Sequence, residues 1–236
     1  MRISVCIATY NGEKYIKEQL DSILRQLTLN DEVVISDDAS TDSTIKIIEG
    51  YKDHRIRVIN NPFEKGYSKN FENAIINAKG DLIFLSDQDD VWLSGKVSKM
   101  IKSLETSTMV ISDAELVDEK LRDLKTTYFS LRGGKAGFVN NLYKSRYLGA
   151  CMAFKREIFK KLLPFPQRQF LCPHDYWLTL VGEFYYKIDI INEPLIKYRR
   201  HSDNASNGGI KSSKSIFQKL SYRIYSLVLL FKRIKI

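Results

Sequence analysis

The chain has 236 residues, of which 44% are apolar and 28% charged, a composition that fits a folded globular protein and excludes disordered and fibrous classes. Its formal net charge is +9, but seven of these nine charges come from lysines and arginines after Asp203, where no acidic residue follows. The body is therefore close to neutral, and the excess charge does not indicate a nucleic-acid-binding protein.

The cysteines and apolar runs bear on the cellular compartment. Cys6, Cys151 and Cys172 lack the close spacing of a metal or redox motif, so we expect free thiols rather than a disulfide framework. The apolar start at residues 3–8 is too short for a signal peptide. Apolar runs such as residues 227–231 are far below the roughly 20 residues that span a bilayer. These features predict a cytoplasmic protein without a spanning helix.

Strand and helix patterns alternate through residues 1–113. Short apolar runs predict strands, and apolar residues three or four positions apart predict the helices between them. This alternation implies right-handed crossovers and an α/β fold whose mostly parallel, Rossmann-like sheet is flanked by helices. The expected strands are residues 3–8, 32–36, 56–59, 82–85 and 109–111, and the expected helices are residues 13–27, 43–51, 68–78 and 96–104.

The second half of the chain has a less regular pattern. We expect residues 114–204 to form a second lobe of the same domain, and residues 205–236 a basic tail. A polar stretch at residues 113–141 predicts a long connection. Further elements are expected as a strand at 149–154, helices at 155–163 and 175–184, and strands at 187–191 and 195–198.

Polar residues follow the first, second and fourth expected strands. Carboxyl ends of parallel strands share one edge of a sheet, where ligands bind near a switch in strand order. For the pair Asp37-Asp38, a turn or helix cap is the simplest interpretation, and a hydrogen bond from a base imide N–H to Asp38 is the alternative. The three clusters are Thr9-Tyr10-Asn11, Asp37-Asp38 and Asp87-Gln88-Asp89-Asp90.

The third cluster places three carboxylates within four residues. Asp87, Asp89 and Asp90 repel one another unless a cation lies among them. Hard oxygen ligands suit Mg²⁺ or Mn²⁺ bridging a diphosphate, where the metal acts as a Lewis acid. A solvated acidic turn is the alternative, although apolar residues frame the cluster on both sides.

Two later residues are candidates on weaker grounds. Asp175 opens an expected helix, so it either stabilises the first helical turn or serves as a general base in a cleft. His201 lies beside Arg199 and Arg200 and could bind metal or phosphate, whereas an isolated histidine is more often a surface residue.

Four segments in this order resemble the family 2 glycosyltransferases of the GT-A fold. They are ISVCIATYN at residues 3–11, VISDDASTD at 34–42, GDLIFLSDQDDVW at 80–92 and HDYW at 174–177. The resemblance extends over roughly residues 1–204, and the combination is more specific than any single segment. A D-Q-D-D-V-W run and a late Y-R-x-H-x-x-N make the sequence similar to the bacterial rhamnosyltransferase-like branch.

The resemblance implies a role for each matching position. Asp175 would be the catalytic base of an inverting reaction. His174 departs from the commoner Glu of a Glu-Asp pair, so Asp175 is the remaining acid there. The implied donor nucleotide contacts are Thr9, Tyr10, Asn11, Asp38, Asp87 and Arg200; the implied ligands of Mn²⁺ or Mg²⁺ are Asp87, Asp89 and His201; the implied acceptor contacts are Trp92, Gly149, Ala150 and His174.

The implied function is transfer of one sugar from a nucleoside-diphosphate sugar, such as dTDP-rhamnose or a UDP-hexose, to a hydroxyl of a growing, lipid-linked cell-surface polysaccharide. A missing Q-x-x-R-W favours single transfer over processive synthesis. The alternative is an inactive nucleotide-sugar-binding scaffold in an assembly complex. The sequence lacks the G-x-G-x-x-G of a dinucleotide-dependent oxidoreductase and the G-x-x-x-x-G-K-[ST] of a P-loop NTPase.

The basic tail predicts an amphipathic helix within residues 216–236. Such a helix either packs on the body or docks on the anionic inner face of the membrane, which would make the protein peripheral. The sequence does not indicate an oligomeric state. The apolar residues that fall on one helical face are Phe217, Leu220, Ile224, Leu227, Val228 and Phe231.

Overall fold

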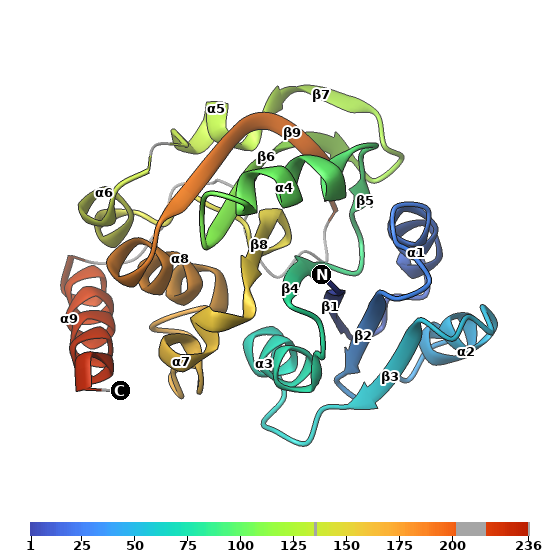
Figure 1. Ribbon diagram of the computed structural model, residues 1–236, viewed down its shortest axis with the longest axis horizontal. Helices are drawn as coiled ribbons and strands as arrows, with labels where there is room; N and C mark the ends of the chain where they lie inside the picture. Colours follow the sequence, from blue (N-terminus) through green and yellow to red (C-terminus); the bar gives the residue numbers. More distant parts are fainter. Residues whose placement is uncertain (135, 202–215, 236) are drawn as a thin grey trace.

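The computed structural model describes residues 1–134, 136–201 and 216–235. A single sheet runs through the molecule, with helices on both of its sides (Figure 1). Its strand order is β3-β2-β1-β4-β8-β6-β9-β5, and β7 pairs with β6 off this path. The buried apolar residues form one core around this sheet, which confirms an α/β fold.

The first half of the sheet is parallel. β1 (Ile3–Thr9), β2 (Glu32–Asp37) and β4 (Leu82–Ser86) are buried along almost their whole length, as expected of parallel strands covered on both faces. β1 lies between β2 and β4, so the strand order switches direction there. The predicted alternation is confirmed by β3 (Ile56–Asn60), α1 (Ile16–Leu24), α2 (Thr44–Glu49) and α3 (Tyr67–Asn77).

The second half of the sheet is mixed. β8 (Met152–Lys155) runs antiparallel to β4 and to β6 (Met109–Asp118). β9 (Ile188–Arg200) is parallel to β6 and antiparallel to β5 (Val91–Trp92). The parallel, Rossmann-like half therefore continues into a mixed half, against which α4 (Lys96–Leu104) packs. The expected lobe boundary at residue 113 lies inside β6, so one sheet continues through both parts of the chain.

The predicted long connection at residues 113–141 is wrong. β6 continues to Asp118 and forms a hairpin with β7 (Asp123–Thr127), followed by α5 (Tyr128–Arg132) and α6 (Phe138–Tyr143). β7 is charged and largely exposed, so it carries no apolar pattern, and its strand conformation comes from pairing with β6.

Two other element predictions need correction. The strands expected at residues 187–191 and 195–198 are one strand, β9, because irregular register against β6 accommodates Pro194. The strand expected from residue 149 begins with a short 3₁₀ turn, Gly149–Cys151, before β8. A second 3₁₀ turn (Arg156–Ile158) leads into α7 (Phe159–Leu162), and α8 (His174–Tyr185) matches the last predicted helix of the body.

The tail forms a helix, α9 (Ile216–Lys232), which ends in a 3₁₀ turn (Arg233–Lys235). α9 lies beside α8 at the edge of the molecule (Figure 1). Residues 205–215 and 236 of the predicted tail lie outside the described residues, as do residues 202–204 at the end of the Y-R-x-H-x-x-N run. All three cysteines are free thiols, as predicted, and all three are buried. Within the described ranges, none of the helices combines the length and apolar character needed to cross a bilayer.

Candidate active site

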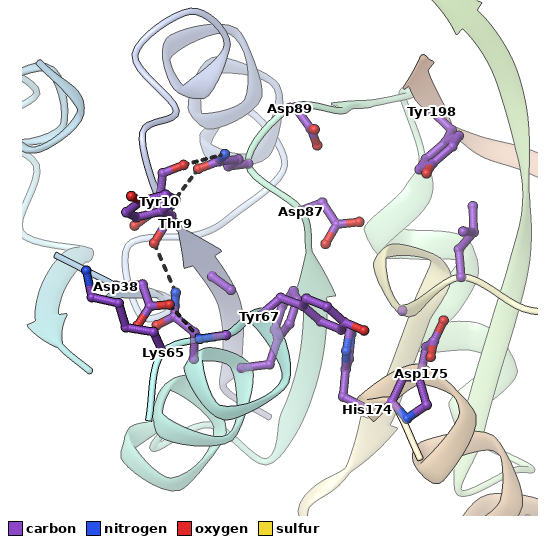
Figure 2. A pocket seen from close by; sticks show the side chains of 18 residues that line it. Thr9, Tyr10, Asp38, Lys65, Tyr67, Asp87, Asp89, His174, Asp175 and Tyr198 are labelled. Atoms are coloured by element: carbon purple, nitrogen blue, oxygen red, sulfur yellow. Dashed lines mark hydrogen bonds between the residues drawn. The ribbon is translucent and has the colours of Figure 1, made fainter. Parts of the chain in front are cut away.

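A cavity of about 610 Å³ lies at the carboxyl ends of β1, β2 and β4. α3, the 3₁₀ turn before β8 and the start of α8 form its other walls (Figure 2). The lining residues come from seven separate parts of the chain: Ala8, Thr9, Tyr10, Asp38, Lys65, Gly66, Tyr67, Asn70, Phe71, Asp87, Gln88, Asp89, Leu148, Gly149, Pro173, His174, Asp175 and Tyr198.

Parallel pairing brings the three predicted polar clusters together. Thr9 lies opposite Asp37 in the register, and its Oγ1 donates to Asp37 Oδ1 at 2.9 Å. The Gln88 side chain bonds both backbone groups of Tyr10, accepting from its N–H and donating to its carbonyl oxygen, each at 3.0 Å. The loops after β1 and β4 are therefore held as one rim of the cavity.

Asp38 is buried at this rim and lines the cavity. Its Oδ1 accepts from Asn61 Nδ2 at 2.8 Å, and its Oδ2 accepts from the Gly66 backbone N–H at 2.7 Å. Gly66 has φ 141°, a conformation that a residue with a side chain rarely adopts. These bonds fix the carboxylate and leave lone pairs for a further donor.

The acid cluster lies at the end of β4. Asp87, Asp89 and Asp90 each offer an oxygen, and these oxygens all lie within 4.8 Å of one another. Burial, with the charges of Asp89 and Asp175, raises the pKa of Asp87 to about 7. Burial, with the charges of Asp89 and Asp87, raises the pKa of Asp90 well above its usual range. Concentrated negative charge in a buried place is the condition that a cation relieves.

The donor set fits a hard divalent cation. His201, at the end of β9, has its Nε2 2.8 Å from Asp89 Oδ2, so an imidazole joins the carboxylates. Asp90 Oδ1 accepts from the Arg199 backbone N–H at 3.0 Å, whereas its buried Oδ2 has no hydrogen-bond partner. Carboxylate oxygens with one imidazole suit Mn²⁺ or Mg²⁺.

A buried lysine lies near the same carboxylates. Lys96 is completely buried, its Nζ donates to the Ala150 carbonyl oxygen at 2.9 Å, and it lies 4.9 Å from the centre of the Trp92 ring. Burial lowers the pKa of Lys96 to about 8, against the opposing effect of Asp90 and Asp87. Lys96 thus provides part of the positive charge that the acid cluster requires.

Asp175 lies at the start of α8, across the cavity from Asp87 (Figure 2). Its Oδ1 accepts from the Tyr176 backbone N–H at 2.7 Å, as a first-turn acid does. Burial raises the pKa of Asp175 to about 6 despite that bond. Asp175 therefore stabilises the first turn of α8 and also presents to the cavity a carboxylate that is more basic than usual.

His174 is buried beside Asp175, and both of its ring nitrogens lack hydrogen-bond partners. Its ring stacks on Phe71 at 4.5 Å between centroids and meets the Tyr67 ring edge-on. Burial lowers the pKa of His174 to about 3, so the ring is neutral at physiological pH. A Cβ at Gly149 would lie 2.5 Å from His174 Nε2, so this wall needs glycine at position 149.

Five residues expected at the site do not line the cavity, and one of them, His201, instead lies against Asp89, which does. Trp92 lies in the core against Phe84, because β5 pairs with β9 and turns the ring inward. Ala150 is buried in the 3₁₀ turn and offers only its carbonyl oxygen, to Lys96. Asn11 has φ 47° and its side chain accepts from the Thr41 backbone N–H, and Arg200 lies opposite Asp118 in the register of β9 against β6.

Several residues in or beside the cavity were missed by sequence reasoning. Gln88 stands inside the acid cluster, and its position there was a usable signal. Phe71 has the spacing of an apolar helix face and nothing more, and Tyr67 begins that helix without any motif. No sequence pattern indicates that Lys65 or the buried Lys96 lies at the site, because lysine is normally a surface residue.

Comparisons with known proteins identify the family. The model of "Glycosyl transferase family 2" matches residues 4–163. The dTDP-rhamnosyl transferase RfbG of Shigella flexneri is 31% identical over 91% of this chain and 78% of its own length. The UDP-Glc:alpha-D-GlcNAc-diphosphoundecaprenol beta-1,3-glucosyltransferase WfaP of Escherichia coli is 38% identical over 50% of this chain, a match that spans only 47% of WfaP.

Two solved structures share the fold. TarS of S. aureus in complex with UDP-GlcNAc has a TM-score of 0.74 and 18% identity, covering 99% of this chain and 72% of that one. The mannosyltransferase PcManGT of Pyrobaculum calidifontis, with GDP-Man and Mn²⁺, has a TM-score of 0.63 and 19% identity, covering 99% and 73%. Since the family model covers more than half of the chain, the protein belongs to glycosyl transferase family 2.

Proposed function

We propose that this protein is an inverting glycosyltransferase that moves one sugar from a nucleoside-diphosphate sugar to a hydroxyl group. The supporting observation is that Asp87 and Asp89 line one side of the cavity and Asp175 the facing side. The first side suits a metal-bound diphosphate, and the second suits a proton acceptor. A sugar bound between them would have its anomeric carbon exposed to an acceptor.

The reaction needs one proton acceptor. The Asp175 carboxylate takes the proton of the acceptor hydroxyl while that oxygen bonds to the anomeric carbon. The bond from this carbon to the diphosphate oxygen breaks, its electron pair leaves with the nucleoside diphosphate, and attack from the opposite side inverts the centre. A pKa of about 6 leaves Asp175 ionised at neutral pH and more basic than an ordinary aspartate.

The leaving group requires positive charge. Asp87, Asp89 and His201 would hold Mn²⁺ or Mg²⁺, which when bound neutralises the diphosphate as it departs. Thr9, Tyr10 and Asp38 would contact the nucleotide, with Asp38 accepting from a base imide N–H. Such an N–H is present in both uracil and thymine. The names of RfbG and WfaP support dTDP-rhamnose or a UDP-hexose as the donor.

The acceptor is proposed to be a growing, lipid-linked cell-surface polysaccharide. WfaP is named for a diphosphoundecaprenol acceptor, which supports this class. His174 and Gly149, beside Asp175, would contact the acceptor sugar. The protein would then work as a peripheral protein at the inner face of the cytoplasmic membrane.

The test is a thermal-shift screen of dTDP-rhamnose and UDP-hexoses with and without Mn²⁺, followed by transfer assays. We expect one donor class to stabilise the protein only with the metal. Asp89→Asn should lose this stabilisation, whereas Asp175→Asn should keep it and lose transfer. A wild-type protein that binds donor but transfers to no acceptor, and whose Asp175→Asn variant behaves identically, would instead be an inactive scaffold.

A further inference from the structure

α9 is oriented with its apolar stripe toward solvent. Five large apolar side chains, three or four residues apart, are between 48% and 81% exposed. A surface helix of a soluble protein normally turns such a stripe toward the core. The outward stripe, as used below, consists of Phe217, Leu220, Ile224, Val228 and Phe231.

The opposite side of α9 is fixed to the body. Ser226 and Leu230 are completely buried, and the Tyr185 hydroxyl of α8 donates to the Leu230 carbonyl oxygen at 2.5 Å. Lys161 Nζ donates to the Arg233 carbonyl oxygen at 2.7 Å. The outward stripe is therefore held in place by packing and hydrogen bonds on the opposite side of the helix.

Neighbouring elements extend the apolar surface. Phe231 meets Phe184 of α8 edge-on at 5.8 Å between ring centroids, and Phe184 is itself exposed. On α6, Tyr143 is 71% exposed, and the Arg223 guanidinium lies over its ring at 4.6 Å. Isolated exposed apolar residues are normal, but a contiguous group indicates an interaction site.

The charged residues of α9 all carry one sign. The sequence has no acidic residue from 216 to 235, whereas Lys219, Arg223 and Lys232 lie along α9. Lys144 is exposed directly after α6. A second copy docking stripe to stripe would bring these cations together, which disfavours self-association. Apolar side chains with flanking cations complement an anionic lipid bilayer, in which negatively charged headgroups cover apolar acyl chains.

We propose that the outward stripe of α9 is the face by which this protein docks on an anionic lipid bilayer, with α9 lying in the plane of the interface. The apolar side chains enter the region between headgroups and acyl chains, and the flanking lysines and arginines meet the lipid phosphates. This inference specifies the surface for the membrane location proposed above, but it does not depend on sugar transfer.

The test is cosedimentation of the full chain with vesicles of phosphatidylcholine, with and without phosphatidylglycerol. We expect binding to the anionic vesicles at least about tenfold tighter than to the neutral ones, weakening as salt is added. The triple variant Ile224→Ser, Val228→Ser and Phe231→Ser should bind about tenfold more weakly or worse. Its matched control replaces equally exposed apolar residues elsewhere, Leu29→Ser, Ile76→Ser and Leu124→Ser, and should bind as the wild type does.

Circular dichroism checks that each variant is folded. The proposal is overturned if the wild type does not bind anionic vesicles, or if the stripe variant and its control bind equally well. It is also overturned if light scattering shows a dimer that the stripe variant breaks, since the stripe would then contact a second copy. Because no nucleotide sugar is used, failure here leaves the proposed transferase activity untouched.

Discussion

Asp175 combines two properties that oppose each other, burial and a negative charge. Its folded pKa of about 6 lies above the ordinary 3.8, so ionised Asp175 destabilises the fold increasingly as pH rises from about 4 to 6. We expect Asp175→Asn to raise the free energy of unfolding at pH 7 by about 1–3 kcal/mol and to lower transfer by about 10²–10⁴-fold. Denaturant unfolding at pH 7 and pH 4 measures the first effect, which should vanish at the lower pH.

The same carboxylate sets the expected pH dependence of transfer. A general base must be ionised, so kcat/KM should fall about tenfold for each pH unit below about 6 and level off above it. The profile is measured with saturating Mn²⁺ from about pH 5 to pH 8. A rate that stays constant through pH 6, or that rises as pH falls, would contradict the assignment of Asp175 as the base.

The contact between Gly149 and His174 predicts a strongly non-additive pair of substitutions. Gly149→Ala puts a Cβ 2.5 Å from His174 Nε2, and overpacking of this kind costs about 1–3 kcal/mol. His174→Ala removes the ring that Gly149→Ala would meet, so the double variant should recover much of that loss. Chemical unfolding of the three variants tests this. If the two changes in the free energy of unfolding simply add, the cavity wall adapts to the added Cβ without help from the second substitution.

At the scale of elements, β9 carries the residue that fixes the loop of the acid cluster. Arg199 is buried; its Nε donates to the Asp89 carbonyl oxygen at 2.7 Å, and its Nη1 to the Glu119 carbonyl oxygen at 2.6 Å. Its Nη2 forms an ion pair with Glu18 of α1 at 2.5 Å. A lysine has one nitrogen where arginine has three, so it cannot make these bonds together.

We therefore expect Arg199→Lys to lower the free energy of unfolding by about 2 kcal/mol and to weaken metal binding. Arg122→Lys is the matched control, because Arg122 forms an exposed ion pair with Asp118 that contributes little. Unfolding curves and Mn²⁺ titration of both variants provide the measurement. Equal behaviour of the two variants would show that β9 does not position the acid cluster.

The elements themselves were predictable to different extents. β1, β2 and β4 are continuous apolar runs, so their positions and the meeting of their polar ends followed from the sequence. β7 and the second half of β6 depend on each other for pairing, and a pattern within one segment does not reveal that. Sequence reasoning also treated Trp92 as a site residue, whereas pairing of β5 with β9 turns it into the core.

A bound cation should raise the free energy of unfolding of the whole molecule. The acid cluster is assembled only in the folded state, so Mn²⁺ at about a hundred times its dissociation constant should add about 2.7 kcal/mol. For a chain of this size that corresponds to a rise in Tm of several degrees. Asp89→Asn should abolish the rise, and Asp123→Asn, an exposed acid on β7, should leave it unchanged.

In the tail, the helical pattern predicts the helix and its apolar face but not which side of the helix faces outward. The face of apolar residues was predictable from spacing, but both interpretations of it, packing on the body and docking elsewhere, fitted the same pattern. The structure attaches α9 to the body by Ser226 and Leu230, on the side opposite most of those apolar residues. Tertiary contacts decide which side of an amphipathic helix faces outward. These contacts join residues far apart in the sequence, such as Tyr185 and the carbonyl of Leu230.

The close approach of Gly149 to His174 also constrains how the family can diverge. The residues at these two positions are expected to co-vary among relatives: chains with histidine before the aspartate should have glycine at the position of Gly149, and chains with a smaller residue there should tolerate alanine or serine. Replacement of Gly149 would then depend on prior change at position 174, so the order in which the two substitutions arise would decide which cavity walls evolution can reach.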